Sequence, residues 1–340
     1  MRDIIDQADK SRIKRIPHLR QLYRDISKDL HEVEETLKLF TTSPNKIISE
    51  ISNYLFQNTG KRIRPALLIL CAKLRGYKGK EHIVMSSLVE TIHTASLIHD
   101  DIIDNSEVRR GRESVHSRWG PNITVLLGDY LYIKTISQSL ESKHRRIVQI
   151  LTDISSKMIE GELDEYYVSW NLDLDENDYL NIIKKKTASL FSASCRIGGI
   201  LGMASEEEEN TLAEFGTNLG MTFQIVDDLL DYTGDENTMG KPVLSDLREG
   251  RITLPLIYTL NNDGKINRKR ITNLLKRKEL NTTSLDQILN IVRSNGALEY
   301  SKKKAQEYSF HSKALIHKMP PSIYRDALSL FPDYILKRNK

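Results

Sequence analysis

Apolar residues recur along most of the chain at the three- and four-residue spacing of an amphipathic α-helix. The segment 84–103 shows this pattern clearly, with apolar or small side chains at Val84, Leu88, Ile92 and Ala95. A longer segment, 205–232, opens with Ser205, a favourable N-cap residue, and with four glutamates that suit the positive end of a helix dipole. The same spacing predicts further helices over residues 122–140, 145–169 and 176–201.

Turn-forming residues separate these segments, at Gly111–Pro121, Asn171–Asp175 and Gly234–Pro242. The last hundred residues again combine helical spacing with polar turns. No block of alternating apolar and polar residues is long enough to build a sheet, and no change of composition marks a domain boundary. The sequence therefore predicts an all-α protein with a single domain over residues 1–340.

The composition is that of an ordinary globular protein. Of the 340 residues, 39% are hydrophobic and 28% are charged, so the chain can bury a sizeable core. The net charge of +4 is too small to require nucleic acid as a partner. The two cysteines, Cys71 and Cys195, have no metal-binding spacing and favour a reducing compartment. Because we find no secretory signal and no run of about 18 apolar residues, we expect a cytoplasmic protein without a transmembrane helix.

Three aspartates, Asp100, Asp101 and Asp104, stand at the C-terminal end of the predicted helix 84–103. Residues four apart lie about 40° apart around a helix, so Asp100 and Asp104 project from one face. The negative end of the helix dipole disfavours carboxylates, and like charges at this spacing repel each other. A hard divalent cation such as Mg²⁺ would neutralise them, and it takes carboxylate, water and phosphate oxygens as ligands.

A second cluster with the same spacing occurs later in the chain, at Asp227, Asp228 and Asp231. One such cluster has an ordinary alternative, the solvated end of a helix. Two of them, each near the end of a long apolar helix, favour a carboxylate-lined cavity that binds several Mg²⁺ ions between facing helices.

Basic residues accompany both acidic clusters, and any one of them alone could be an ordinary exposed side chain. They stand before an apolar helix, after each cluster and before the threonine of KKKTASLF: Lys61, Arg62, Arg64, Arg109, Arg110, Lys186 and Lys241. The planar fork of arginine suits phosphate oxygens, and lysine supplies a mobile point charge. Two candidate metal clusters with several bases therefore point to a diphosphate substrate.

In these motifs the sequence resembles the trans-prenyltransferases, the head-to-tail polyprenyl diphosphate synthases. The resemblance spans nearly the whole chain and rests on GKRIRP, IHTASLIHDDIIDNSEVRRGR, GDYLY, KTASLF, FQIVDDLLDYTGD and GKPVLSDLREGRITLPLIY. It implies an all-α bundle of the isoprenoid-synthase type around a deep central cavity, a homodimer, and Mg²⁺-dependent condensation of isopentenyl diphosphate with an allylic diphosphate. A peripheral contact with a membrane is compatible with release of such a product.

The resemblance also implies a role for each motif residue. The six aspartates would hold Mg²⁺ on the allylic diphosphate: Asp100, Asp101, Asp104, Asp227, Asp228 and Asp231. That diphosphate would be bound by Arg109, Lys186 and Lys241, and isopentenyl diphosphate by Lys61, Arg64, His93 and Arg110. With Lys186, the expected catalytic residues are Thr187 and Gln224, whose dipoles would stabilise an allylic cation. Without the family pattern, a lone His93 in a helix is more often a core histidine.

Product length is expected to depend on two residues just before the first acidic cluster. Ala95 and Ser96 lie about one turn, or 5.4 Å, deeper along the helix than Asp100, and as small residues they leave room for a chain of about C30–C50. Bulky aromatic residues there would close the cavity under a short product. Two alternatives stay open: the small residues serve only close helix packing, or the product is farnesyl or geranylgeranyl diphosphate.

Three positions depart from the family pattern. Glu165 stands where glutamine is frequent in GExxQ, Leu244 where glycine is common after GK, and Arg251 where lysine is frequent in EGK. None of these changes removes a candidate metal ligand. A terpene cyclase shares the first acidic motif, but it typically carries an Asn/Ser/Glu triad in place of DDLLD and lacks a second diphosphate site. A non-catalytic partner subunit commonly loses the aspartates that this chain retains.

Overall fold

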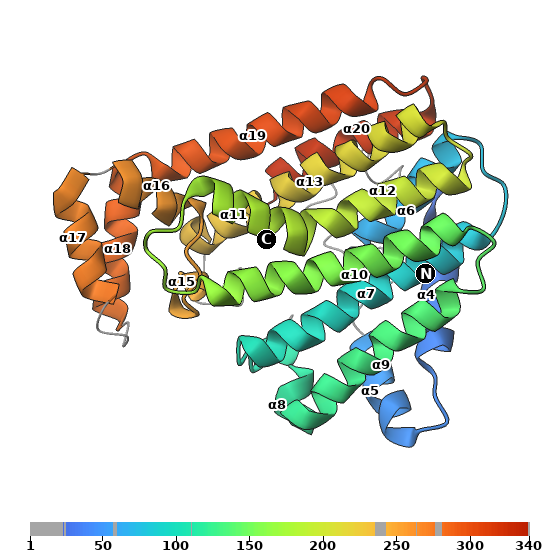
Figure 1. Cartoon of the computed structure of the whole chain (residues 1–340), viewed down its shortest axis with the longest axis horizontal. Coiled ribbons are helices and arrows are strands. Elements are labelled where there is room, and N and C mark those ends of the chain that lie inside the picture. Colours follow the sequence, from blue (N-terminus) through green and yellow to red (C-terminus); the bar gives the residue numbers. More distant parts are fainter. Residues whose placement is uncertain are drawn as a thin grey trace. The chain divides into compact units, whose positions relative to one another are not determined.

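The structure, a computed structural model, describes residues 23, 25–56, 60–109, 111–234, 243–262, 264–275 and 281–338. Nearly all of these residues are helical, which confirms the predicted all-α fold (Figure 1). In chain order the α-helices are α4 (Ser27–Thr41), α5 (Lys46–Phe56), α6 (Ile63–Leu74), α7 (Glu81–Ile103), α8 (Val115–Trp119), α9 (Pro121–Ser139), α10 (Arg145–Tyr167), α11 (Glu176–Ile183), α12 (Ser189–Leu201), α13 (Glu206–Thr233), α15 (Ser245–Arg248), α16 (Leu254–Asn262), α17 (Gly264–Leu275), α18 (Thr282–Ser294), α19 (Ala297–Ile316) and α20 (Ile323–Leu336). Within the described ranges the only strands are β1 (Val108–Arg109) and β2 (Arg112–Glu113), which pair as a short antiparallel hairpin.

The predicted helices agree with the observed ones to within a few residues, since α7, α9 and α10 correspond to the segments 84–103, 122–140 and 145–169. The predicted N-cap of α13 is also confirmed. Ser205 Oγ accepts from the N–H of Glu208 at 3.3 Å, and Glu208 Oε2 accepts from the N–H of Ser205 at 2.9 Å. The segment 176–201 differs in one respect, because a π-helical turn (Lys184–Ala188) joins α11 to α12.

The described chain divides into two compact units, each assembled from separate segments. The first contains the residues up to Ser156 together with Ser189–Gly216 and Ser312–Phe331. The second contains Lys157–Ala188, Thr217–His311 and the residues from Pro332 onward. Because each unit draws on segments that are far apart in the sequence, no shift of composition along the chain could mark a boundary. The single domain expected over residues 1–340 stays a prediction.

The first unit is built around α6, which is apolar on all sides. Every residue of this helix from Pro65 to Ala72 is buried. It packs against α7 and α12, and α7 in turn packs against α4 and α9 (Figure 1). Gly198 permits the close approach of α12, since a Cβ there would lie 2.5 Å from the carbonyl oxygen of Leu68. Burial of α6 thus positions α7, the helix that carries the first acidic cluster.

In the second unit, α11 packs beside α16, which also contacts α17 and α18. The part of α10 that belongs to this unit approaches the π-helical turn closely. Gly161 makes this approach possible, because a Cβ at this position would lie 2.6 Å from the backbone nitrogen of Lys186. The polar side chains of α10 therefore come within reach of Lys186.

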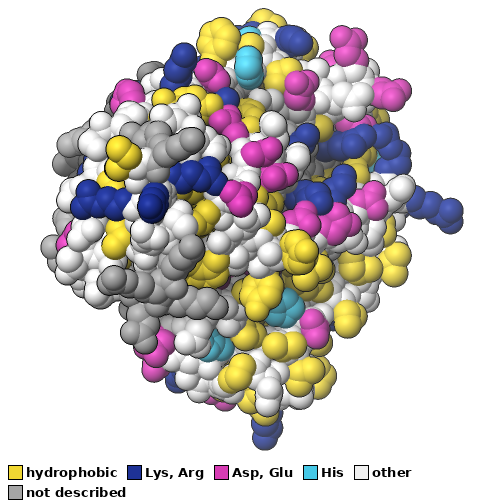
Figure 2. Space-filling view, turned by 60° about the vertical axis from the view of Figure 1, so that its left-hand side comes forward, with side chains coloured by type: hydrophobic (Ala, Val, Ile, Leu, Met, Phe, Trp, Pro, Cys, Tyr) yellow, Lys and Arg dark blue, Asp and Glu magenta, His cyan; other side chains and the backbone are white. Residues whose placement is uncertain are grey.

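Charged side chains of both signs are mixed on the face of the molecule shown in Figure 2, in line with the small net charge. Four large apolar side chains are nevertheless exposed along α9 and at its C-cap: Val125, Leu126, Ile133 and Leu140. Of the helices that the structure describes, none combines the length and the apolar character needed to cross a membrane.

Candidate active site

The first acidic cluster lies where α7 ends. Asp104 is the C-cap residue, and its N–H donates to the carbonyl oxygen of Asp100 at 2.8 Å. Asp101 is buried, whereas Asp100 and Asp104 are half-buried. The Nε of Arg109, on β1, donates to a carboxylate oxygen of Asp101. Burial raises the pKa of Asp101 above its ordinary value, and the positive charge of Arg109 opposes that shift.

A cavity of about 90 Å³ lies beside this cluster within the first unit. Its polar lining includes His93, Asp101 and Arg109, and its apolar lining includes Leu97 and Val115. Three residues that the sequence assigns to metal or substrate therefore line one cavity. A charged end beside an apolar wall suits a substrate that joins a diphosphate to a hydrocarbon.

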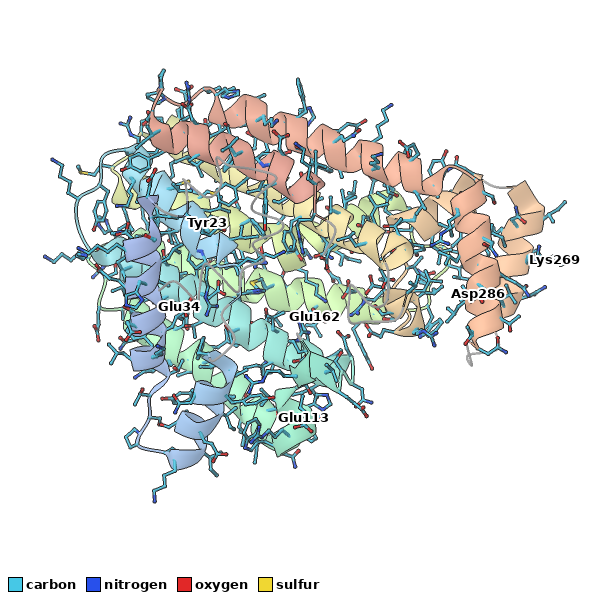
Figure 3. The ribbon with its side chains drawn as sticks, turned by 180° about the vertical axis from the view of Figure 1, so that it is seen from behind. Tyr23, Glu34, Glu113, Glu162, Lys269 and Asp286 are labelled. Carbon is cyan, nitrogen blue, oxygen red and sulfur yellow. The ribbon has the colours of Figure 1, made fainter. Side chains whose placement is uncertain are left out.

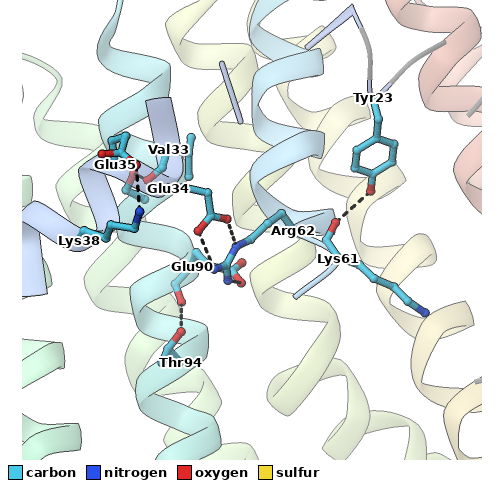
Figure 4. A network of polar contacts seen from close by, with 10 residues as sticks. Tyr23, Val33, Glu34, Glu35, Lys38, Lys61, Arg62, Glu90 and Thr94 are labelled. Atoms are coloured by element: carbon cyan, nitrogen blue, oxygen red, sulfur yellow. Dashed lines mark hydrogen bonds and ion pairs between the residues drawn. The ribbon is translucent and has the colours of Figure 1, made fainter. Parts of the chain in front are cut away.

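The basic segment before α6 places its three side chains in different environments. Lys61 is exposed, and its carbonyl oxygen accepts from the hydroxyl of Tyr23 at 3.1 Å. The guanidinium of Arg64 lies 4.5 Å from the centre of the Phe191 ring, a cation–π contact. Arg62 is buried, and its charge is matched inside the protein by two glutamates (Figure 4). Its positive charge is therefore already paired within the protein.

The second acidic cluster lies within α13, which continues to Thr233. Asp228 is buried and accepts two hydrogen bonds, from the Tyr179 hydroxyl at 2.5 Å and from Gln224 Nε2 at 2.8 Å. Asp227 is the exposed member, and Arg338 Nη2 lies 3.4 Å from its Oδ1. The two neighbouring aspartates thus differ in access: Asp228 is held by the protein, while Asp227 faces outward.

Asp231, the third member of this cluster, is buried and caps the short helix α15. It accepts from the N–H and the hydroxyl of Ser245 at 3.0 and 2.7 Å, and from the N–H of Asp246 at 3.3 Å. Leu244, one of the departures from the family pattern, precedes α15 with a left-handed φ of 59°. That conformation explains why glycine suits this position, and full burial of the leucine side chain offsets part of its cost.

The cap on α15 brings a further carboxylate, Asp246, next to the cluster. Burial and the nearby charge of Asp231 raise the pKa of Asp246 to about 7. Burial also raises the pKa of Asp228, and the charge of Asp246 adds to that shift. Arg251, another departure, pairs with Asp246 at 3.2 Å and with Glu249. Among the described residues around this cluster, the carboxylates therefore outnumber the bases that pair with them, Arg251 and Arg338.

Lys186 and Thr187 lie on the π-helical turn. Lys186 Nζ is 2.6 Å from a carboxylate oxygen of Glu162, which lies on α10 (Figure 3), and 2.5 Å from one of Glu165. Thr187 Oγ1 donates to Gln224 Oε1 at 2.7 Å. Since Gln224 also donates to Asp228, a continuous chain of hydrogen bonds joins the expected catalytic pair to the second acidic cluster. The third departure, Glu165, gives Lys186 a second carboxylate partner.

The acidic clusters suit a hard cation, although no three histidine, cysteine or carboxylate side chains among the described residues lie close enough to hold one ion by themselves. Burial and neighbouring carboxylates raise the pKa values of Asp228 and Asp246, so a bound cation would stabilise their ionised forms. Mg²⁺ typically takes only one or two protein carboxylates and completes its coordination with water and phosphate oxygens. The donors present therefore fit this ion when it arrives with a diphosphate.

Ala95 is fully buried in an apolar cluster with residues of α5, α7 and α9, including Ile51, Ile98 and Leu127. Close packing of α7 against α9 accounts for a small residue at this position. Ser96 is half-buried, and its hydroxyl donates to the carbonyl oxygen of His93 at 2.9 Å. The structure thus supplies a packing role for Ala95 and leaves Ser96 as the more accessible of the pair.

Arg110 and Lys241 lie outside the described residues. The structure adds Glu162, Tyr179 and Asp246 to the candidate site residues, and none of them has a role predicted from the sequence, although Glu162 is the glutamate of the GExxQ pattern. The spacing of Glu162 and Glu165 was an available signal, since residues three apart share a helix face. Nothing in the sequence indicates a site role for Tyr179, because one tyrosine in an amphipathic helix is ordinarily a core residue.

Known proteins resemble this chain over most of its length. The sequence matches the polyprenyl synthetase family over residues 45–292. The octaprenyl diphosphate synthase of Escherichia coli (strain K12) is 31% identical over 302 residues, which cover 89% of this chain and 93% of that protein. The geranylgeranyl diphosphate synthase of Saccharolobus solfataricus is 34% identical over 321 residues, covering 92% and 96%. The crystal structure of a polyprenyl synthase from Caulobacter crescentus CB15, complexed with calcium and isoprenyl diphosphate, matches with a TM-score of 0.90 at 31% identity, over 95% of this chain and 98% of that one.

The all-α fold and the two aspartate clusters define the class of the protein as a prenyltransferase with the isoprenoid-synthase fold. The chain belongs to the polyprenyl synthetase family, and its activity is the elongation of prenyl chains. Both statements confirm what the motifs predicted.

Proposed function

We propose that the protein condenses isopentenyl diphosphate with an allylic diphosphate, in a Mg²⁺-dependent head-to-tail reaction, to make an all-trans polyprenyl diphosphate. Each condensation breaks the C–O bond of the allylic diphosphate, forms a C–C bond to isopentenyl diphosphate, and releases diphosphate and a proton. The observation that carries the proposal is the pair of aspartate clusters, each with a buried middle carboxylate, Asp101 or Asp228, and at least one more accessible neighbour.

The accessible aspartates are the ones we assign to the metal: Asp100, Asp104 and Asp227. Their neighbours Asp101, Asp228 and Asp231 are buried and accept hydrogen bonds from the protein, so they orient the clusters and add negative charge. When bound, Mg²⁺ would neutralise charge that develops on the leaving diphosphate.

Basic side chains would bind the two diphosphates. We assign the allylic diphosphate to Arg109, Lys186 and Lys241, and isopentenyl diphosphate to Lys61, Arg64, His93 and Arg110. Arg109 and Lys186 are paired with carboxylates in the structure, so the substrate has to share or displace these partners. The Thr187–Gln224 hydrogen bond orients an amide whose dipole would stabilise positive charge on the allylic carbons.

Incubation with labelled isopentenyl diphosphate, an allylic primer and Mg²⁺ tests the reaction. Linear products that lengthen by isoprene units, vanish with a chelator and return with Mg²⁺ support the proposal. Cyclic hydrocarbons would identify a terpene cyclase instead. A complete lack of turnover would indicate a non-catalytic partner subunit.

We further propose a long-chain product of about C30–C50, because the residues about 5.4 Å deeper than Asp100 are small. The similarity to an octaprenyl diphosphate synthase supports this length, while that to a geranylgeranyl diphosphate synthase favours the shorter alternative. Chromatography of the dephosphorylated products decides between them, and arrest at farnesyl diphosphate under excess isopentenyl diphosphate would exclude the long chain. Ser96→Phe should shorten the product with little loss of stability, whereas Ala95→Phe should also destabilise the packed cluster, by about 1–3 kcal/mol.

We infer that the protein acts in the cytoplasm as a homodimer, with a peripheral membrane contact for product release. Leu126, Ile133 and Leu140 recur every seven residues on one side of α9 and are 69%, 70% and 68% exposed. Such an apolar stripe is typical of a subunit contact. Light scattering after gel filtration tests the dimer, and Ile133→Glu should yield monomers.

A further inference from the structure

Arg62 lies between two residues assigned to isopentenyl diphosphate, Lys61 and Arg64, yet its side chain is only 9% exposed. It is the N-cap residue of α6 and adopts a left-handed conformation, with φ 49° and ψ 39°. This conformation costs a residue other than glycine about 1–2 kcal/mol. A strained backbone conformation persists only where surrounding contacts stabilise it, and the side chain of Arg62 makes such contacts.

Two glutamates from different helices hold the guanidinium of Arg62 (Figure 4). Glu34 of α4 accepts from Nε at 2.5 Å and from Nη2 at 3.0 Å, and Glu90 of α7 accepts from Nη1 at 2.5 Å. Both glutamates are buried. Burial by itself lowers the pKa of Arg62, but the charges of Glu90 and Glu34 outweigh this effect and raise the pKa, so the guanidinium stays positive.

These ion pairs connect the basic segment to the helix that carries His93. Glu90 lies one turn before His93 on α7, and both residues line the cavity beside the first acidic cluster, as does Arg62. The hydroxyl of Tyr23 holds the same segment from another direction, at the carbonyl oxygen of Lys61. The segment is thus held at two adjacent residues, at Lys61 through its carbonyl oxygen and at Arg62 through its side chain.

We propose that Arg62, held by Glu34 and Glu90, is a positioning residue for isopentenyl diphosphate, which keeps Lys61 and Arg64 where they bind that substrate. The inference rests on the function proposed above. Arg62 is not assigned to the substrate itself, because all three nitrogens of its guanidinium already donate to carboxylates. A buried ion group of this kind adds little net stability compared with an apolar replacement, so its use here is orientation.

Glu34→Gln provides the sharpest test, because positioning and simple electrostatics predict opposite signs. Removal of a negative charge near an anion site should strengthen binding of the anion and lower the KM for isopentenyl diphosphate. Loss of positioning should instead raise that KM, by about fivefold, since small displacements of a binding group are costly. The KM for the allylic diphosphate should change by less than about twofold, because Arg109 pairs with Asp101 and Lys186 pairs with Glu162 and Glu165. Steady-state kinetics with each substrate varied in turn measure both values.

Arg62→Lys keeps the charge but cannot reach both glutamates with a planar fork, so it should raise the same KM by about tenfold. Glu209→Gln is the matched control. Glu209 is also a buried glutamate of the first unit, and its Oε1 accepts from Arg146 and Arg196, both at 2.7 Å. This variant should lose a similar amount of thermal stability while both KM values stay unchanged.

A fall or no change in the KM for isopentenyl diphosphate in Glu34→Gln would overturn the inference, as would an equal rise for both substrates. If Arg62→Lys does not fold, Glu34→Gln alone decides. The proposed function is tested separately by the wild-type protein. A wild type without turnover would overturn the proposed function and this inference with it, whereas wild-type turnover with an unaltered KM in the variant overturns the inference alone.

Discussion

The two aspartate clusters have the same spacing in the sequence and different surroundings in the structure. In the first, the buried middle aspartate, Asp101, is paired with the cation of Arg109. In the second, the buried middle aspartate, Asp228, accepts from the neutral donors of Tyr179 and Gln224. The buried middle aspartate is therefore stabilised by an opposite charge in the first cluster and by neutral hydrogen-bond donors in the second.

The difference decides how much negative charge each cluster retains. Arg109 opposes the rise in the pKa of Asp101, whereas Asp246 adds to the rise at Asp228. Asp231 accepts three hydrogen bonds from the start of α15 and thereby brings Asp246 close. Neutral donors orient a carboxylate without cancelling its charge, so we expect the second cluster to depend more strongly on a bound cation.

The largest effect is expected from Asp100→Ala in the first cluster. Turnover should fall by about 10³ or more, because a lost metal ligand removes charge stabilisation from the transition state. Asp100 is half-buried at a helix end, so circular dichroism and the melting temperature should stay close to wild type. Retention of near-full activity would remove Asp100 from the metal site.

Tyr179→Phe tests the neutral donors of the second cluster. Loss of the hydroxyl leaves Asp228 with one fewer donor, and turnover should fall by about tenfold, with a higher Mg²⁺ concentration needed for half-maximal rate. Tyr232→Phe is the control, because it removes the same group from a buried tyrosine whose hydroxyl accepts from Thr253, whereas that of Tyr179 donates to Asp228. Equal effects of the two substitutions on the Mg²⁺ requirement would contradict the role of Tyr179.

The clusters also show how far the sequence predicts this site. Helical spacing and the two DDxxD motifs were enough to place Asp100 at the end of α7 and Asp227 near the end of α13. Those features are local, because each depends on residues within a few turns. The partners Tyr179 and Asp246 come from other segments, and only tertiary packing brings them together. Arg62 shows a related limit, since two glutamates that are distant in the sequence bury a base of a motif predicted to bind diphosphate.

The excess charge of the second cluster should appear in the pH dependence of stability. The pKa of Asp246 is raised from 3.8 to about 7, so the folded protein binds this proton more tightly than the unfolded chain. Its contribution to stability is complete below the unfolded value and is lost as the pH rises through about 7. Between about pH 5 and pH 8 the free energy of unfolding should therefore fall by roughly 1–3 kcal/mol, since one pKa unit corresponds to about 1.4 kcal/mol.

Urea denaturation across this pH range measures the slope. Asp246→Asn should flatten it, and Mg²⁺ should stabilise the protein more at the alkaline end, where the carboxylates are charged. The first cluster should contribute a smaller slope, because Arg109 opposes the pKa shift of Asp101. A wild-type protein whose stability rises steadily with pH over this range would show that the second cluster is already neutralised without metal.

The smallest effect is expected from a substitution of Glu165, the departure from the family pattern that pairs with Lys186. Glu162 and Glu165 both pair with this lysine, so an incoming diphosphate competes with two carboxylates. Glu165→Gln removes one charge and keeps the shape of the side chain, and the KM for the allylic diphosphate should fall by about threefold, the worth of one partly exposed ion pair.

Asp164→Asn is the matched control for Glu165→Gln, because Asp164 lies on the same helix and pairs with Lys185 at 2.7 Å. It should leave the KM for the allylic diphosphate unchanged. If Glu165→Gln instead raises this KM, Glu165 holds Lys186 in its binding position. The carboxylate of Glu165 then assists binding of the diphosphate and does not compete with it. The sign of this small shift therefore decides whether the extra carboxylate opposes the substrate or, as Glu34 is proposed to do for Arg62, orients the base.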